Sequence, residues 1–167
     1  SERNTYRQFN YDTQLYMSSV LEISDVFSRT RDEASSGDYS LLLKASPEDE
    51  SSPRIVGGEI ARIDFPQDVQ MYYKISLKTW LSELDSGALV LREQFFDKHG
   101  DVIMEVPLDH ISRLEQGWTE HRYQRNIFRF ELFESARSLA LYAALDSQTV
   151  EPVKGAAYLD DVEILLP

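Results

Sequence analysis

The sequence predicts an all-β fold, a sandwich of antiparallel sheets, and three observations support this. Apolar residues occur in short runs of strand length that are separated by turn signals. One run, 69–81, alternates between apolar and polar positions with a period of two. The hydrophobic fraction of 42% in 167 residues is enough for one core, and the length corresponds to about one domain of ~150 residues. We therefore expect residues 1–167 to form a single domain.

Composition and charge exclude several classes of function. The 17 basic and 29 acidic residues give a formal net charge of −12, whereas phosphate backbones and anionic membranes attract basic surfaces. No run of about 18 apolar residues predicts a transmembrane helix. The chain contains no cysteine, which excludes disulfides and thiol nucleophiles. It starts at a serine without a signal peptide, so we expect it to be part of a longer polypeptide.

The expected strands follow from the positions of the apolar runs. They are residues 39–44, 59–65, 69–81, 88–96, 101–106, 125–133, 138–145 and 157–166. Residues 97–100 form a hairpin turn in which Gly100 takes a positive φ. Residues 107–117 are predicted as a short helix that is capped by Asp109 and ended by Gly117. Residues 1–34 are the N-terminal strand and lead-in, and 46–58 are an acidic, proline-containing loop that we expect to be flexible.

Alternation assigns faces to the central strands. Tyr73, Ile75, Leu77 and Leu81 fall on the core face of 69–81, together with Val69 and Met71. The opposite face is polar but carries two aromatic residues. Its members are Tyr72, Lys74, Ser76, Lys78 and Trp80. By the same rule, Ile60 and Ile63 are expected to point inward from 59–65.

Three groups of residues support a more specific prediction of the fold. In chain order they are SGDYSL at 36–41; YKISLKTW at 73–80 with FDKHG at 96–100; and GWT at 117–119 with LALY at 139–142, Gly155 and YLDDV at 158–162. Together they resemble the carbohydrate-binding modules of the cellulose- and xylan-binding type, which are galactose-binding-like jelly rolls. The resemblance covers roughly residues 35–166.

The resemblance implies a jelly-roll sandwich of two sheets and no catalysis. It also implies glycan binding on a concave sheet face or at loop tips, and a structural calcium ion. The chain departs from the pattern in two places. The loop at 45–58 is unusually acidic, and residues 9–12 match the opening signature only loosely.

Sugar rings stack on aromatic side chains, while their hydroxyls bind amides and charged groups. The candidate carbohydrate-binding residues are therefore Tyr72, Lys74, Trp80, Arg92, Gln94 and Tyr142. We expect Arg92 and Gln94 to lie beside the aromatic face on a neighbouring strand. Tyr72 and Trp80 are eight residues apart, about 26 Å at roughly 3.3 Å per residue, a span that suits an oligosaccharide. The basic residues suggest an acidic or uronate-bearing glycan.

The alternative is that these aromatic residues lie under loops and extend the core. Trp118, which follows Gly117, is interpreted as a core residue in this way. Burial of Tyr72 and Trp80 would favour a structural or protein-interaction domain without a sugar ligand.

Asp160 shares the inward side of its strand with Val162 and Ile164. A buried carboxylate must be paired or bound to metal. The resemblance places calcium beside Asp160, with Gly37 and Asp12 or Asp38 as further contributors. The alternative is that Asp160 caps a backbone turn or pairs with an arginine.

Two other motifs are interpreted as accidental. Residues 54–58, RIVGG, copy the activation site of trypsin-like zymogens, but the chain is too short for that fold. His99, His110 and His121 are evenly spaced but fall in three different predicted elements, which disfavours a shared metal site. The leading hypothesis is a non-catalytic, extracellular carbohydrate-binding module. The competing hypothesis is a structural or interaction domain of a larger surface or envelope protein.

Overall fold

A computed structural model describes residues 5–9, 27–35, 37, 39–64, 72–126 and 135–166. Their regular elements are all strands: β1 Thr5–Phe9, β2 Phe27–Thr30, β3 Ser40–Ala45, β4 Ile55–Asp64, β5 Tyr72–Leu84, β6 Ala88–Phe96, β7 Val102–Ile111, β8 Thr119–Asn126, β9 Ser138–Asp146 and β10 Gly155–Leu166. Within these residues, no helix is long and apolar enough to cross a membrane.

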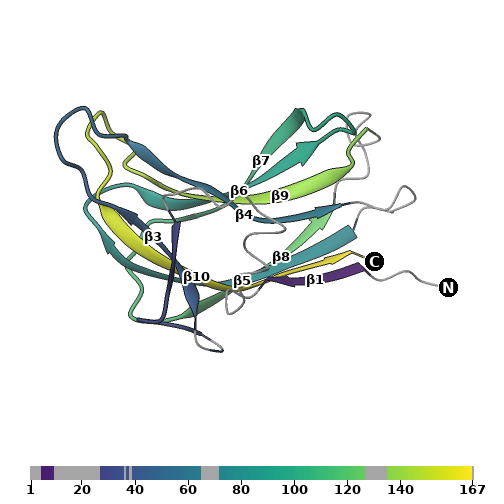
Figure 1. Ribbon diagram of the computed structural model, residues 1–167, viewed down its shortest axis with the longest axis horizontal. Coiled ribbons are helices and arrows are strands. Elements are labelled where there is room, and N and C mark those ends of the chain that lie inside the picture. The colour runs from purple at the N-terminus through teal and green to yellow at the C-terminus, as the bar shows by residue number, and fades with distance from the viewer. Residues whose placement is uncertain are drawn as a thin grey trace.

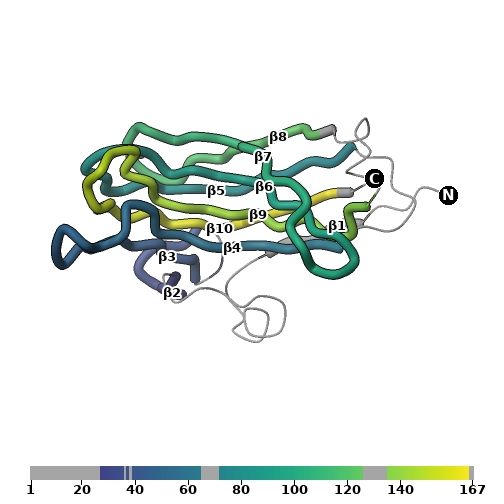
Figure 2. The backbone as a smooth tube through the Cα atoms, turned by 90° about the horizontal axis from the view of Figure 1, so that it is seen from above, coloured from purple at the N-terminus to yellow at the C-terminus, as the bar shows by residue number. Residues whose placement is uncertain are grey.

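The strands form two antiparallel sheets that pack face to face (Figure 1). The six-stranded sheet has the order β2-β3-β10-β5-β8, with β1 paired to β10, and the four-stranded sheet has the order β4-β9-β6-β7. Figure 2 shows β7 and β8 along one edge of the sandwich and β2 and β3 along the other. The predicted all-β jelly-roll sandwich is confirmed.

The core lies between the sheets and follows the predicted alternation. Tyr73, Ile75, Leu77 and Leu81 are at most 2% exposed. They belong to a cluster with residues from β6 and β9, namely Leu89, Leu91, Phe95, Leu139, Leu141 and Leu145. Val69 and Met71, predicted for the same face, lie outside the described residues.

A β-bulge explains why Ile60 and Ile63 are both buried although they are three residues apart. The pairing of β4 with β9 shifts register between Glu59 and Ala61. An extra residue in one strand changes which side chains face inward, so both isoleucines reach the core. The inward prediction for Ile60 and Ile63 is confirmed.

The helix predicted over 107–117 is wrong. Residues 107–111 continue β7, and 112–118 form a loop that carries no helix. Pro107 is tolerated because β7 is an edge strand and its register against β6 shifts between Leu91 and Arg92. Asp109 does not cap a helix: its Oδ1 accepts the N–H of His110 at 2.7 Å.

Two predicted boundaries also change. The strand expected at 125–133 starts earlier, as β8 at Thr119, and 127–134 lie outside the described residues. Residues 55–58 of the predicted acidic loop belong to β4. The remaining turn is exposed, and Ser52 Oγ accepts the N–H of Glu48 at 3.0 Å. Its flexibility stays a prediction. The hairpin turn at 97–100 is confirmed, with Gly100 at φ +82°.

Candidate functional site

The predicted carbohydrate-binding residues lie on two opposite surfaces. Tyr72, Lys74 and Trp80 are on the outer face of the six-stranded sheet, because their strand neighbours Tyr73 and Leu81 point into the core. The other three candidates, Arg92, Gln94 and Tyr142, are on the outer face of the four-stranded sheet. The expectation that Arg92 and Gln94 lie beside Tyr72 and Trp80 is wrong, because β5 and β6 belong to different sheets.

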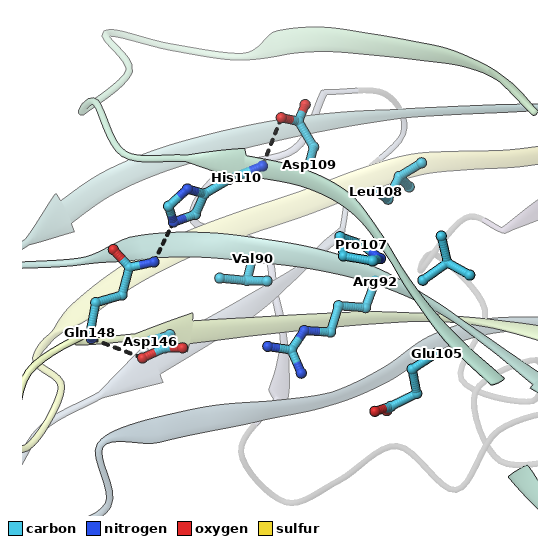
Figure 3. A pocket seen from close by; sticks show the side chains of 10 residues that line it. Val90, Arg92, Glu105, Pro107, Leu108, Asp109, His110, Asp146 and Gln148 are labelled. Carbon is cyan, nitrogen blue, oxygen red and sulfur yellow. Dashed lines mark hydrogen bonds between the residues drawn. The ribbon is translucent and has the colours of Figure 1, made fainter.

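The outer face of the four-stranded sheet carries a cleft of about 620 Å³ (Figure 3). We call it the β6–β7 cleft. It is lined by Val90, Arg92, residues 105–110, Asp146 and Gln148. In Figure 1 the end of this sheet that carries β7 rises away from the six-stranded sheet.

Strand register brings Tyr142 next to Arg92 in this region. Tyr142 on β9 pairs with Arg92 on β6 and with Glu59 on β4. Within the described part of the chain, neither the guanidinium of Arg92 nor the hydroxyl of Tyr142 makes a hydrogen bond or ion pair. Both groups are therefore available to a ligand.

Other polar groups of the cleft are held in place by one another. Gln94 Nε2 donates to Glu105 Oε1 at 2.6 Å. The backbone N–H of Gln148 donates to Asp146 Oδ1 at 2.8 Å. Tyr123 of β8 donates its hydroxyl hydrogen to Asp109 Oδ2 at 2.5 Å. Asp109 is thereby held toward the other sheet, whereas Glu105 and Asp146 lie on the same side as the guanidinium of Arg92 (Figure 3).

The balance of charge in the cleft is negative. Glu105 and Asp146 supply two carboxylates, against the single guanidinium of Arg92. Asp109 also lines the cleft, but it pairs with the core residue Leu91 and its carboxylate faces Tyr123 of the other sheet. The basic side chains Lys74 and Lys78 lie on the other sheet, and Lys78 pairs with Asp161 at 3.3 Å. The expectation of an acidic glycan rested on the lysines of that other face, so it does not apply to the β6–β7 cleft.

The aromatic residues of the opposite face pack against each other. The ring of Trp80 lies 6.2 Å from that of Trp118 and 5.7 Å from that of Tyr158, and all three residues are partly buried. The indole N–H of Trp80 donates to the carbonyl of Glu115 at 3.1 Å. This matches the alternative interpretation for Trp80, which packs under a loop. Trp118, predicted as a core residue, is part of that loop and lies outside the core between the sheets. Tyr72, at the other end of β5, is 58% exposed.

Glu115 fastens the loop 112–118 to β5. Its Oε1 accepts the N–H of Leu81 and the hydroxyl hydrogen of Thr79, both at 2.8 Å. Burial alone would raise the pKa of Glu115, but hydrogen bonds from His121, Thr119, Leu81 and Thr79 outweigh it and hold the pKa below its ordinary value. The carboxylate therefore stays charged where it joins the loop to Thr79 and Leu81 of β5.

Asp160 is fully buried, as predicted. Its Oδ2 accepts the N–H of Ser35 at 2.9 Å, and its Oδ1 accepts the N–H of Asp161 at 2.8 Å. Asp161 has φ +49°, and the pairing of β10 with β5 is interrupted from Asp160 to Glu163. Asp160 therefore accepts hydrogen bonds from backbone groups at an irregular turn, as the alternative hypothesis for this residue predicted.

The described residues do not by themselves make a calcium site at Asp160. No group of three or more His, Cys, Asp or Glu side chains is placed to hold a metal in this part of the chain. Asp12 and Asp38, the further predicted contributors, lie outside it, and Gly37 is exposed with φ +62°. The calcium ion stays a prediction.

The three evenly spaced histidines have separate surroundings. His99 lies in the hairpin turn after β6, and Nε2 of His121 is 2.8 Å from Thr79 Oγ1. His110 lies at the cleft, where its Nε2 meets the side-chain amide of Gln148. Sequence analysis did not identify His110 or Gln148 as site residues. The helix predicted at 107–117 gave no reason to place His110 on the outward face of a strand, and Gln148 lies in a turn after β9 that carries no motif.

At the level of sequence, the chain matches no known protein family or curated protein. Solved structures do match. The CBM22-1 xylan-binding domain from Paenibacillus barcinonensis Xyn10C has a TM-score of 0.58 at 15% identity, over 99% of this chain and 97% of that one. Family 16 Carbohydrate Binding Module-2 has a TM-score of 0.53 at 11% identity, over 89% and 91%.

The chain therefore has the jelly-roll fold that these carbohydrate-binding modules have. The same fold also occurs within a longer protein: an arabinose-bound α-L-arabinofuranosidase, MgGH51, matches with a TM-score of 0.61 at 15% identity, over 93% of this chain but 24% of that one. At these identities the likeness defines the architecture of the module. Its ligand must be inferred from its own residues.

Proposed function

We propose that this chain is a non-catalytic module that binds a neutral oligo- or polysaccharide in the β6–β7 cleft. The observation that carries the proposal is the guanidinium of Arg92, which has no partner among the described residues and lies beside Tyr142, close to fixed amides and carboxylates. The likeness to carbohydrate-binding modules supports it.

The chemistry of the cleft suits sugar hydroxyls. A guanidinium offers five N–H donors in a planar fork, and carboxylates accept hydrogen bonds from hydroxyl groups. Arg92 and Glu105 supply these two kinds of group on adjacent strands. Val90, which lines the cleft, and the ring of Tyr142 beside Arg92 offer apolar surface to the C–H faces of a sugar.

A neutral glycan fits better than an acidic one. Two carboxylates, those of Glu105 and Asp146, lie in the cleft against one guanidinium, and the whole chain carries a net charge of −12. The negative charge of the cleft and that of the whole chain both repel a polymer of uronate groups. An uncharged chain pays no such penalty and uses the carboxylates as hydrogen-bond acceptors.

The test is titration calorimetry with soluble xylan, hydroxyethylcellulose and a polyuronate. We expect a neutral polysaccharide to bind and the polyuronate not to bind. Arg92→Ala should weaken binding by about 1.5–3 kcal/mol, since a charged donor is lost, which is roughly ten- to a hundredfold in Kd. Lys74→Ala, which removes a cation from the opposite sheet, is the matched control and should bind like the wild type.

The competing function is a structural or protein-interaction domain without a sugar ligand. It predicts that no polysaccharide binds and that Arg92→Ala and Lys74→Ala behave alike. As further parts of our proposal, the module is extracellular or on the cell surface and belongs to a larger polypeptide. A structural calcium ion near Asp160 is also proposed, and its test is given below.

A further inference from the structure

We propose, on the basis of the function proposed above, that the cleft is closed at one end and recognises the end of a glycan chain. The closure is the contact between Nε2 of His110 and the side-chain amide of Gln148, which we call the His110–Gln148 bridge. The two residues come from different elements. His110 is on β7, and Gln148 lies in the turn after β9.

The bridge spans the cleft rather than lying in its floor. Between β7 and β9 in the sheet lies β6, and the β6 residue paired with His110 is Val90. Figure 3 shows the side chains of His110 and Gln148 meeting across this strand, beside Val90. A ligand that lies along β6 therefore meets a barrier at this point.

The turn that carries Gln148 is held firmly. Ser147 is 1% exposed, and its hydroxyl donates to the carbonyl of Glu151 at 2.8 Å while its N–H donates to the carbonyl of Arg54 at 2.9 Å. Gln148 itself has φ +59°, and its N–H donates to Asp146. A non-glycine residue keeps such a backbone only where its surroundings impose it. The turn is thus a built feature that projects Gln148 over the cleft.

The other end of the cleft has a side-chain contact of a different kind. Gln94 and Glu105 are direct cross-strand partners, so their 2.6 Å hydrogen bond lies along the sheet surface. This hydrogen bond is part of the floor of the cleft and does not block a ligand that lies along β6. The cleft therefore has one open end, at Gln94, and one barred end, at Val90.

This asymmetry decides how a chain can bind. A glycan bound through an internal stretch must leave the cleft at both ends, and it would have to displace the His110–Gln148 bridge. A glycan that enters from the Gln94 side can place its terminal sugar against the bridge. The additional hydroxyl of that terminal sugar then finds hydrogen-bonding groups on His110 and Gln148.

The test compares soluble xylan with the same mass of that xylan cut into shorter fragments by an endo-acting hydrolase. If xylan does not bind, hydroxyethylcellulose treated in the same way replaces it. Titration calorimetry gives the moles of protein bound per gram. For the wild type we expect this capacity to rise in proportion to the number of chain ends.

A double variant, His110→Ala with Gln148→Gly, removes both sides of the bridge, and glycine accepts the positive φ at 148. We expect it to bind uncut polysaccharide at several-fold higher capacity, with no further gain from cutting. Lys74→Ala, on the outer face of the opposite sheet, should behave like the wild type.

The outcomes separate the two levels of the proposal. Wild-type protein that binds uncut chains at many internal positions, with a capacity unaffected by the double variant, overturns chain-end recognition and leaves the proposed function intact. Wild-type protein that binds neither polysaccharide, cut or uncut, contradicts the proposed function, and the inference falls with it.

Discussion

Glu93 shows how a single charged side chain joins the two sheets. It is fully buried on β6, where its Oε2 accepts the Nε–H of Arg125 at 2.9 Å and its Oε1 accepts the hydroxyl hydrogen of Tyr73. Burial raises the pKa of Glu93, although the bonds from Tyr73 and Arg125 oppose the shift. The partners come from β5 and β8 in the other sheet.

Removing this carboxylate should be costly, because Arg125 and Tyr73 would lose their common partner. We expect Glu93→Ala to lower the free energy of unfolding by about 3–5 kcal/mol in chemical denaturation. Glu120→Ala removes the acid of an exposed pair with Arg122 and should cost less than about 1 kcal/mol. Equal losses for the two variants would show that the buried group does not link the sheets.

Asp160 lends itself to a similar experiment. Its two carboxylate oxygens accept the backbone N–H groups of Ser35 and Asp161. Asp160→Ala leaves these donors without their partner, so we expect a loss of about 1–3 kcal/mol of stability. A thermal melt of the variant that overlays the wild type would exclude this capping role.

The calcium proposal is tested on the same pair of proteins. An ion that binds only the folded state, at a hundredfold excess over its Kd, contributes about 2.7 kcal/mol. We therefore expect a chelator to lower the Tm of the wild type and to leave that of Asp160→Ala unchanged. If thorough chelation moves neither melting curve, calcium has no structural role here.

At the scale of elements, the loop 112–118 explains why aromatic residues occur on the outer face of the six-stranded sheet. Trp80 packs against Trp118 and Tyr158, and its N–H binds the loop at Glu115. We expect Trp80→Ala to lower stability by about 2–3 kcal/mol, somewhat below the cost in a full core, and to leave the Kd for polysaccharide unchanged. Weaker glycan binding with unchanged stability would return the sugar site to this face.

Glu115 makes the attachment of the same loop depend on pH. Because its folded pKa lies below its ordinary value of 4.5, its stabilising contribution is present above pH 4.5 and is lost as the pH falls through the folded pKa. We expect Glu115→Gln to be less stable than the wild type at neutral pH. The difference should shrink once the pH is below 4.5, as measured by denaturation at each pH. A difference that stays constant would refute this linkage.

The alternation along β5 and β6 predicted the face of each side chain but not its sheet. Leu77 and Phe95 are buried as the pattern requires, yet β5 and β6 pass into different sheets through the turn at 85–87. Gly87 there has φ +92°, and a Cβ would lie 1.8 Å from the carbonyl of Asp146. Local sequence cannot show such a crossing, because it depends on contact with a strand some sixty residues away.

The same limit applies to β7. Its register against β6 shifts twice, and Pro107 interrupts its pattern, so the residues after 106 matched a helix better than a strand. His110 was therefore misplaced. By contrast, β6 was predicted with its observed bounds, since a turn borders it on each side and no bulge disturbs its inward residues.

At the scale of the whole molecule, the β6–β7 cleft is a product of strand order. The strand order β4-β9-β6-β7 places four residues from separate parts of the chain in one row across the sheet. They are Glu59, Tyr142, Arg92 and Pro107. Composition and motifs predicted the jelly roll, and residue types predicted Arg92, Gln94 and Tyr142. Only the fold separates these three from Tyr72, Lys74 and Trp80.

The most direct test of the central claim is a map of the binding surface by amide chemical shifts during titration with a soluble neutral polysaccharide. The account predicts that the shifts concentrate on β6, β7, β9 and the turn at Gln148, around Arg92 and Tyr142. Amides near Trp80 and Lys74 on the opposite sheet should stay unchanged. Shifts confined to the six-stranded sheet would contradict the assignment of the cleft, and no shift with any polysaccharide would contradict the proposed function.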